Sequence, residues 1–188
     1  LGTSLDLAVA ADATTAGGFR DAVLAEVERL DAILSGWRND TPIARLARGE
    51  SIADAPAELV EVLDLAETWR IRSSGAFDVR IGVVADAWQQ ANGKDGAPTA
   101  EVIAAALQQM RDTGVELDRD SRTLKPTGKP RLTVDGLAKG YILDRALAAA
   151  RRNFPQVTGA LLDIGGDAVA FGTAPGGRAF RVGIADPL

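Results

Sequence analysis

The sequence predicts an α/β fold, on the borderline with α+β, in which a mixed sheet is covered by helices. Two patterns predict it: apolar residues recur every three or four positions in the longer segments and every second position in the shorter ones. Glycine- and proline-rich clusters separate the segments, so helices and strands are mixed along the whole chain. With 188 residues, of which 46% are hydrophobic and 25% charged, we expect a single domain over residues 1–188.

The first elements follow from this spacing. Alternation over Leu5–Val9 predicts a half-buried strand, and the apolar spacing after Gly17-Gly18 predicts an amphipathic helix that ends near Gly36. Pro56 is suited to the first position of a second helix. Ser73-Ser74-Gly75 is expected to stop that helix.

The middle of the chain reads as short elements. Phe77–Ile81 alternates and is predicted to be extended, whereas Val83–Ala91 is predicted to be a short helix that carries Trp88. Asn92–Gly96 is a turn cluster. A longer helix is expected over Thr99–Met110.

The last third predicts five strands and one helix. Two short strands are expected at Val115–Leu117 and Leu132–Val134, joined through Pro126-Thr127-Gly128, and a helix follows from about Leu137. Ile142, Ala146 and Ala149 are expected to share one face of that helix. The chain then closes with apolar strands at Ala160–Ile164, Ala168–Phe171 and Phe180–Ile184.

Composition excludes several classes of function. The net charge is −5 and no block of Lys or Arg occurs, which argues against nucleic acid or an anionic membrane surface as the main partner. The absence of Cys and His excludes disulfides, thiol chemistry, Cys/His zinc sites and a His-based triad within these residues. No apolar run approaches the ~20 residues that span a bilayer, so no membrane span is expected in this chain. The start at Leu1-Gly2-Thr3-Ser4 is neither an initiator Met nor a signal peptide, and a longer precursor is expected.

Two glycine-rich segments are candidates for binding a phosphate-bearing ligand. Val134–Tyr141 runs from a strand into a helix, and its small residues, free helix N–H groups and Lys139 ammonium suit a phosphate. A tight strand-to-helix turn with a surface lysine is the more common explanation of such a segment. Asp163–Asp167 is either a cradle for ribose or base edges or an ordinary hairpin turn. A P-loop and the G-x-G-x-x-G fingerprint are both missing.

Aromatic and acidic residues supply two further candidates. In Gly75–Asp78 an aromatic ring precedes a carboxylate, and both could contact a ligand. Phe77 could equally be a core residue, and Asp78 a helix cap or a solvated charge. Trp37 can stack on a flat ring. A half-buried Trp in a core is nevertheless more common.

Taken in order, these segments resemble the motif series of the ApbE family, the FAD:protein FMN transferases. The resemblance spans nearly the whole chain, and its most specific parts are the Ala-Lys-Gly-Tyr and Ile-Gly-Gly-Asp motifs. The matching segments are Gly2-Thr3, Leu34–Trp37, Gly75–Val79, Gly136–Tyr141 with Asp144-Arg145, Asp163–Asp167 and Gly183–Pro187.

The resemblance implies a truncated ApbE-like flavin transferase fold and a transferase activity. Members of the family use Mg²⁺ to split the pyrophosphate of FAD, move FMN onto a threonine hydroxyl of a target flavoprotein and release AMP. Positioning and charge neutralisation are the general requirements of phosphoryl transfer. Some relatives hydrolyse FAD to FMN and AMP instead.

Residue by residue, the resemblance implies a flavin site and one metal ligand. FAD would contact the backbone at Leu1, the ring of Trp37 where relatives often have Tyr, the segment Ala76, Phe77 and Asp78, and Thr133 and Lys139. The main-chain carbonyl of Gly136 would take the position of a Mg²⁺ ligand, since Mg²⁺ prefers oxygen.

The chain departs from the family pattern at several positions. Many members have Asp at the position of Thr133, whereas the nearest carboxylate in this chain is Asp135, two residues later. Relatives also commonly have Thr at the position of Arg80. The family's metal-binding Asp and Thr and its catalytic-region His are expected beyond Leu188, so the catalytic residues are unknown and residues 1–188 alone are expected to be inactive.

Several alternatives therefore stay open. The chain is expected to be an FAD:protein FMN transferase or part of one, a non-catalytic flavin- or partner-binding module, an FAD pyrophosphatase, or an unrelated domain whose turns mimic the series. The family is typically exported, so the expected location is periplasmic or extracytoplasmic, with anchoring through a removed N-terminal segment and a cytoplasmic location both left open.

Overall fold

In the computed structural model, which describes residues 3–92 and 96–183, the chain forms two compact units. The first unit combines residues up to 29 with residues from 139 onward, and the second is made of residues 30–138. Both contain helices and strands, which confirms the predicted class, and the described strands pair antiparallel, as in α+β folds. That the whole chain is a single domain stays a prediction.

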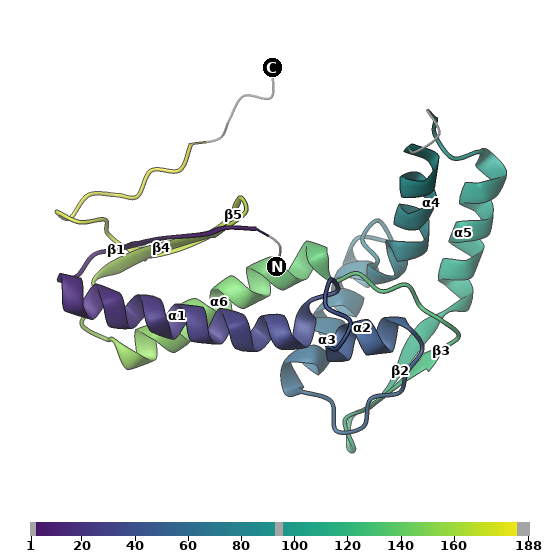
Figure 1. Cartoon of the computed structure of the whole chain (residues 1–188), viewed down its shortest axis with the longest axis horizontal. Helices are drawn as coiled ribbons and strands as arrows, with labels where there is room; N and C mark the ends of the chain where they lie inside the picture. Colours follow the sequence, from purple (N-terminus) through teal and green to yellow (C-terminus); the bar gives the residue numbers. More distant parts are fainter. Residues whose placement is uncertain (1–2, 93–95, 184–188) are drawn as a thin grey trace. The chain divides into compact units, whose positions relative to one another are not determined.

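The first unit contains a three-stranded antiparallel sheet in the order β1-β4-β5 (Figure 1). The strands are β1 (Leu5–Val9), β4 (Gly159–Ile164) and β5 (Asp167–Gly172). The central strand β4 places Leu162 opposite Leu7 on one side and Val169 on the other. Because β4 pairs on both edges, it carries most of the buried residues of the sheet.

Two helices pack on this sheet, α1 (Ala13–Leu34) and α6 (Asp135–Asn153), each of which also continues into the second unit. In Figure 1 their portions in the first unit run along the same side of the sheet. The fully buried Phe19 ring of α1 lies 6.3 Å from the Phe154 ring and 6.5 Å from the Phe171 ring between centroids. Aromatic burial of this kind stabilises a small core.

Helix α1 begins earlier than the sequence predicts. The Asp12 carboxylate accepts hydrogen bonds from the backbone N–H groups of Thr14 and Thr15, both at 3.1 Å, and thereby caps the helix. The predicted start after Gly17-Gly18 is wrong, because both glycines are helical. Gly18 is required for packing, since a Cβ there would lie 2.6 Å from the Phe154 ring.

The turn between β4 and β5 is a hairpin turn. Gly165 and Gly166 have φ angles of +60° and +95°, and positive φ at both central residues is the requirement of a type I′ turn. The backbone N–H of Gly166 donates to the Asp163 carboxylate at 2.8 Å. The hairpin interpretation of Asp163–Asp167 is therefore confirmed.

The second unit combines a two-stranded antiparallel hairpin with helices (Figure 1). Its elements are α2 (Pro42–Ala47), α3 (Ala57–Arg72), the 3-10 helix η1 (Val79–Ile81), α4 (Gly82–Asn92), α5 (Ala100–Asp112), β2 (Gly114–Asp118) and β3 (Thr123–Thr127). Helix α3 ends at Arg72, directly before Ser73-Ser74-Gly75, as the sequence predicts. Thr99 caps α5 through its side chain, which accepts from the N–H of Val102. Strand β3 is tied to the preceding chain through Leu124, which is fully buried and exchanges two backbone hydrogen bonds with Ile52.

Three strand predictions are wrong. Val79–Ile81 forms a 3-10 helix rather than extended chain, because the Asp78 side chain accepts from the backbone N–H of Arg80 at 2.9 Å. The strand partner of β2 is β3, not Leu132–Val134, because Asp118 turns the chain directly after β2. Residues 180–182 and Gly183 form no strand, and Ile184 lies outside the described residues.

Helix α6 buries Ile142 and Ala146 as predicted, whereas Ala149 is half-buried and Ala150 is fully buried. No helix within the described ranges has the length and apolar character needed to cross a membrane.

Candidate functional site

Two segments that are far apart in sequence run side by side in the second unit. The backbone N–H of Thr133 donates to the carbonyl of Val79 at 2.7 Å, and the N–H of Gly82 donates to the carbonyl of Arg131 at 3.1 Å. A Cβ added at Gly136 would lie 3.2 Å from Cε2 of Phe77. The structure thus brings the predicted site residues Ala76, Phe77, Asp78, Thr133 and Gly136 into one region.

The segment that begins at Gly75 is fixed by its own turn. Gly75 has a φ of +85° and its N–H donates to the Arg70 carbonyl at 2.8 Å, at the end of α3. The backbone N–H of Phe77 donates to Oγ of Ser73 at 2.9 Å. Ala76 is exposed and Phe77 half-buried, so this turn reaches the surface while its backbone is held by hydrogen bonds to Ser73 and Arg70.

Asp78 is a buried carboxylate with a strong partner. Its residue is only 7% exposed, and Arg80 forms an ion pair with it at 2.5 Å between Nη2 and Oδ2. Burial raises the pKa of the Asp78 carboxyl, but the hydrogen bonds from the Arg80 side chain and backbone outweigh this and hold the pKa below the ordinary value of 3.8. Asp78 is therefore ionised at neutral pH and acts as a hydrogen-bond acceptor.

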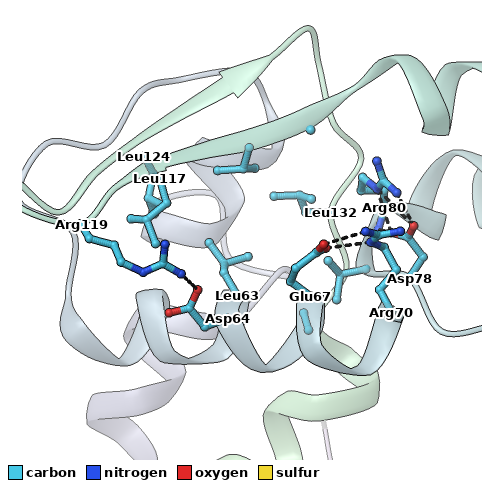
Figure 2. Close-up of a pocket in the computed structure, with 14 residues that line it drawn as sticks. Leu63, Asp64, Glu67, Arg70, Asp78, Arg80, Leu117, Arg119, Leu124 and Leu132 are labelled. Atoms are coloured by element: carbon cyan, nitrogen blue, oxygen red, sulfur yellow. Dashed lines mark hydrogen bonds and ion pairs between the residues drawn. The ribbon is translucent and has the colours of Figure 1, made fainter. Parts of the chain in front are cut away.

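A pocket of about 520 Å³ lies on the side of this segment that faces α3 and the β2–β3 hairpin (Figure 2). Its apolar lining includes Leu63, Leu117 and Leu132. Its charged residues form three Arg–carboxylate pairs, which Figure 2 draws as dashed lines, and these are Asp64–Arg119, Glu67–Arg70 and Asp78–Arg80. Because each charge has an opposite partner, the pocket presents little net charge.

Trp37 lies in the loop after α1 and its residue is 76% exposed. The expectation of a half-buried core Trp is wrong, whereas the exposed indole is free to stack on a flat ring. The loop after it is held by Thr41, whose hydroxyl donates to the Ser35 carbonyl at 2.7 Å and accepts from the N–H of Ala44 at 3.2 Å. The ring is therefore presented to solvent from an anchored loop.

Lys139 belongs to the part of α6 in the first unit. Its ammonium lies 2.6 Å from the Asp167 carboxylate, directly after the Gly165-Gly166 turn. This side chain is 32% exposed and is thus not an isolated surface lysine. The ion pair fixes a cation beside the hairpin turn, where it can bind an anionic group once Asp167 releases it.

The described residues do not make up a Mg²⁺ site by themselves. Gly136 lies in the first turn of α6, so its carbonyl oxygen belongs to the hydrogen-bonding ladder of the helix, which a metal would have to share. Within 3–92 and 96–183, no group of three or more His, Cys, Asp or Glu is placed to hold a metal. Leu1, predicted to contact FAD through its backbone, lies outside the described residues.

Sequence reasoning missed two partners in this arrangement. Arg80 appeared only as a departure from the family pattern, although the Asp-x-Arg spacing around a capping Asp78 is a local pattern that could have indicated the ion pair. The Lys139–Asp167 pair joins a helix to a distant strand, and no local pattern reveals it.

Comparison with known proteins gives consistent results. The model of the ApbE family matches residues 1–188. The FAD:protein FMN transferase of Klebsiella pneumoniae (strain 342) is 24% identical over 187 residues, which is 95% of this chain and 53% of that protein. The chain therefore spans about half the length of this curated relative.

Solved structures show the same fold. The flavinyl transferase ApbE of Pseudomonas stutzeri, in its apo form, matches with a TM-score of 0.77 and 23% identity over 98% of this chain and 59% of its own. The flavin transferase ApbE of Vibrio cholerae matches with a TM-score of 0.74 and 21% identity over 100% of this chain and 62% of its own.

Proposed function

Because this chain belongs to the ApbE family, we propose that it forms the FAD-binding part of an FAD:protein FMN transferase. The observation that carries the proposal is that the predicted ligand contacts at Ala76–Asp78 lie beside those at Thr133 and Gly136. The Phe77 ring lies next to Gly136, and the Thr133 N–H donates to Val79, the residue after Asp78. The Gly75–Val79 and Gly136–Tyr141 motifs are far apart in sequence, so the proximity of Phe77 and Gly136 favours this proposal over an unrelated domain whose turns mimic the series.

The proposed reaction transfers FMN from FAD to the side chain of a threonine in a target flavoprotein. The P–O bond between the two phosphates of FAD breaks on the FMN side, a new P–O bond forms to the threonine oxygen, AMP leaves and the hydroxyl proton is released. Such a transfer depends mainly on holding the pyrophosphate and acceptor in line.

The described residues supply binding and orientation for this reaction. The chain around the exposed Ala76 and the half-buried Phe77 offers carbonyl groups to an edge of the nucleotide, while the N–H groups of both residues are held by Ser73. The exposed Trp37 ring offers a stacking surface. Thr133 adds a hydroxyl. The Lys139 ammonium provides a point charge that suits a phosphate.

Mg²⁺ dependence is part of the same proposal. Mg²⁺ would supply charge neutralisation at the pyrophosphate. The carbonyl of Gly136 is the one ligand that the family resemblance assigns to the described residues, and we place the remaining ligands outside them. Removal of divalent cations by a chelator is expected to abolish turnover of the full-length protein, and unchanged turnover would refute this part.

The test uses the full-length protein that contains this chain, mixed with FAD, Mg²⁺ and a flavoprotein carrying an acceptor threonine. Covalent flavin on the acceptor together with stoichiometric AMP is the expected result. AMP and free FMN without acceptor modification would assign an FAD pyrophosphatase instead. FAD binding without AMP would assign a non-catalytic flavin module, and absence of FAD binding would refute the flavin assignment.

The partner and location complete the proposal. The target is a flavoprotein with an exposed threonine, and the reaction takes place in the periplasm or another extracytoplasmic compartment, as the family resemblance implies. Fractionation of cells that express the full-length protein checks the location, and recovery with the cytoplasmic fraction would contradict it.

A further inference from the structure

We propose that Arg80 is a positioning residue that holds Asp78, and with it the backbone of Ala76 and Phe77, in the geometry that binds FAD. The inference rests on the proposed function for its ligand. It concerns a residue that does not itself touch the nucleotide and that acts through its neighbour.

The Arg80 side chain joins two elements through three of its nitrogens. Nε donates to both carboxylate oxygens of Asp78 at 2.9 and 3.2 Å, and Nη2 donates to Oδ2 at 2.5 Å. Nη1 donates to the carbonyl of Thr113 at 3.1 Å, immediately before β2. Because the guanidinium is planar, this set of bonds fixes both the orientation of the carboxylate and its distance from β2.

Burial increases the contribution of these contacts to holding Asp78 in place. The Asp78 side chain is 5% exposed and that of Arg80 is 23% exposed, so water competes poorly for either group. A charged pair that is largely removed from water loses more when one partner is deleted than an exposed pair does. The Arg119–Asp64 pair at the same pocket has side chains 69% and 46% exposed and provides a matched comparison.

The neighbouring cation Arg70 is close enough to act on Asp78 by its charge, but its described hydrogen bonds go elsewhere. Arg70, from α3, is engaged by Glu67 through Nε at 2.7 Å and Nη2 at 2.6 Å. Figure 2 shows this second pair beside Asp78 and Arg80, and the Arg70 charge also helps to lower the Asp78 pKa, although less than the Arg80 bonds do. Loss of the Arg80 side chain would therefore leave the buried Asp78 carboxylate with the backbone N–H of residue 80 as its donor among the described hydrogen bonds.

The side chains of Phe77 and Asp78 point to different neighbours, which explains how Arg80 affects the ligand site without contacting the ligand. The Phe77 ring lies against Gly136, whereas the next side chain, Asp78, turns to Arg80 in the pocket. Fixing Asp78 therefore fixes the backbone on which Phe77 and Ala76 are presented. If Asp78 is released, this backbone gains freedom that FAD must remove when it binds.

The experiment compares Arg80→Gln, Arg80→Lys and the control Arg119→Gln in the full-length protein. Two quantities are measured: amide hydrogen exchange over residues 76–81 without ligand, and the dissociation constant for FAD. We expect faster exchange and about tenfold weaker FAD binding in R80Q, about threefold weaker binding in R80K, and a change under about twofold in R119Q. Lysine keeps the charge but not the planar fork, which is why its rescue is partial.

The outcomes separate the positioning role from the proposed function. Wild-type exchange over residues 76–81 in R80Q overturns the positioning role, whether or not FAD binds. Faster exchange with unchanged FAD affinity overturns the link to the ligand. If the wild-type protein binds no FAD, the proposed function fails, and the exchange comparison still decides whether Arg80 holds the segment. Should R80Q not fold, R80K gives the same comparison.

Discussion

Gly82→Ala is the sharpest test of how the two segments of the candidate site are held together. Gly82 has φ of −52° and ψ of −35°, so any residue could adopt its backbone conformation. The requirement for glycine comes from packing instead. A Cβ there would lie 2.3 Å from the carbonyl oxygen of Arg131, far inside van der Waals contact, and the clashing atom is backbone.

The expected cost follows from the contacts that must shift. Relief of the clash separates Gly82 from Arg131 and strains the neighbouring hydrogen bond from Thr133 to Val79. Weakening these two hydrogen bonds, at about 1 kcal/mol each, costs about 2 kcal/mol. Residual overpacking adds about 1–2 kcal/mol. We therefore expect destabilisation of about 3–4 kcal/mol, with weakened FAD binding because Phe77 and Gly136 lose their contact.

Urea unfolding followed by circular dichroism measures this change, and Gly17→Ala is the control. A Cβ at Gly17 meets nothing within 4 Å, so alanine in that helical position should stabilise by about 0.5–1 kcal/mol. A Gly82→Ala midpoint equal to that of the wild type would show that the two segments do not touch as described.

Three further predictions follow. Trp37→Ala should weaken FAD binding by about two- to tenfold, since stacking contributes about 0.5–1.5 kcal/mol, and flavin fluorescence titration checks this. The free energy of unfolding should change by less than about 0.5 kcal/mol because the ring is exposed, and a larger loss of stability would contradict that exposure. Asp167→Asn should strengthen FAD binding about two- to threefold at low salt, because it frees the Lys139 ammonium from its partner, and weaker binding would oppose that role for Lys139. Asp78 has a folded pKa below its ordinary value of 3.8, so its carboxylate stabilises the fold at neutral pH and this contribution is lost as pH falls through the folded pKa. The stability difference between wild type and Asp78→Asn should therefore be largest near about pH 7 and shrink below pH 3.8, and a difference that is constant with pH would contradict the ion pair.

The elements that the sequence predicts correctly are those with strong local causes. The alternation over β1 and the end of α3 before Ser73-Ser74-Gly75 depend on neighbouring residues, so they can be predicted without tertiary contacts. The Gly165-Gly166 pair indicates a hairpin turn as one of two alternatives for the same local reason. The start of α1 is predicted too late because Gly17 and Gly18 lie inside the helix, and the Phe154 ring, distant in sequence, leaves no room for a Cβ at Gly18.

The errors around the candidate site have non-local causes. Leu132–Val134 has the composition of a strand, but its backbone makes no ladder: the Thr133 N–H donates to Val79 in η1, and the Val134 carbonyl accepts from the start of α6. The motif order correctly indicated that Phe77 and Gly136 belong to one region. It could not indicate the Arg80 bridge to Thr113 or the Asp167 partner of Lys139, because these depend on chain segments brought together by folding.

The central claim is that FAD binds where Ala76–Asp78 and Thr133–Gly136 lie together. Amide hydrogen exchange of the full-length protein with and without FAD tests it most directly. Binding is expected to slow exchange in both segments and to leave the turn at Asp118–Thr123 unchanged. FAD that binds without protecting either segment would show that the flavin site lies elsewhere.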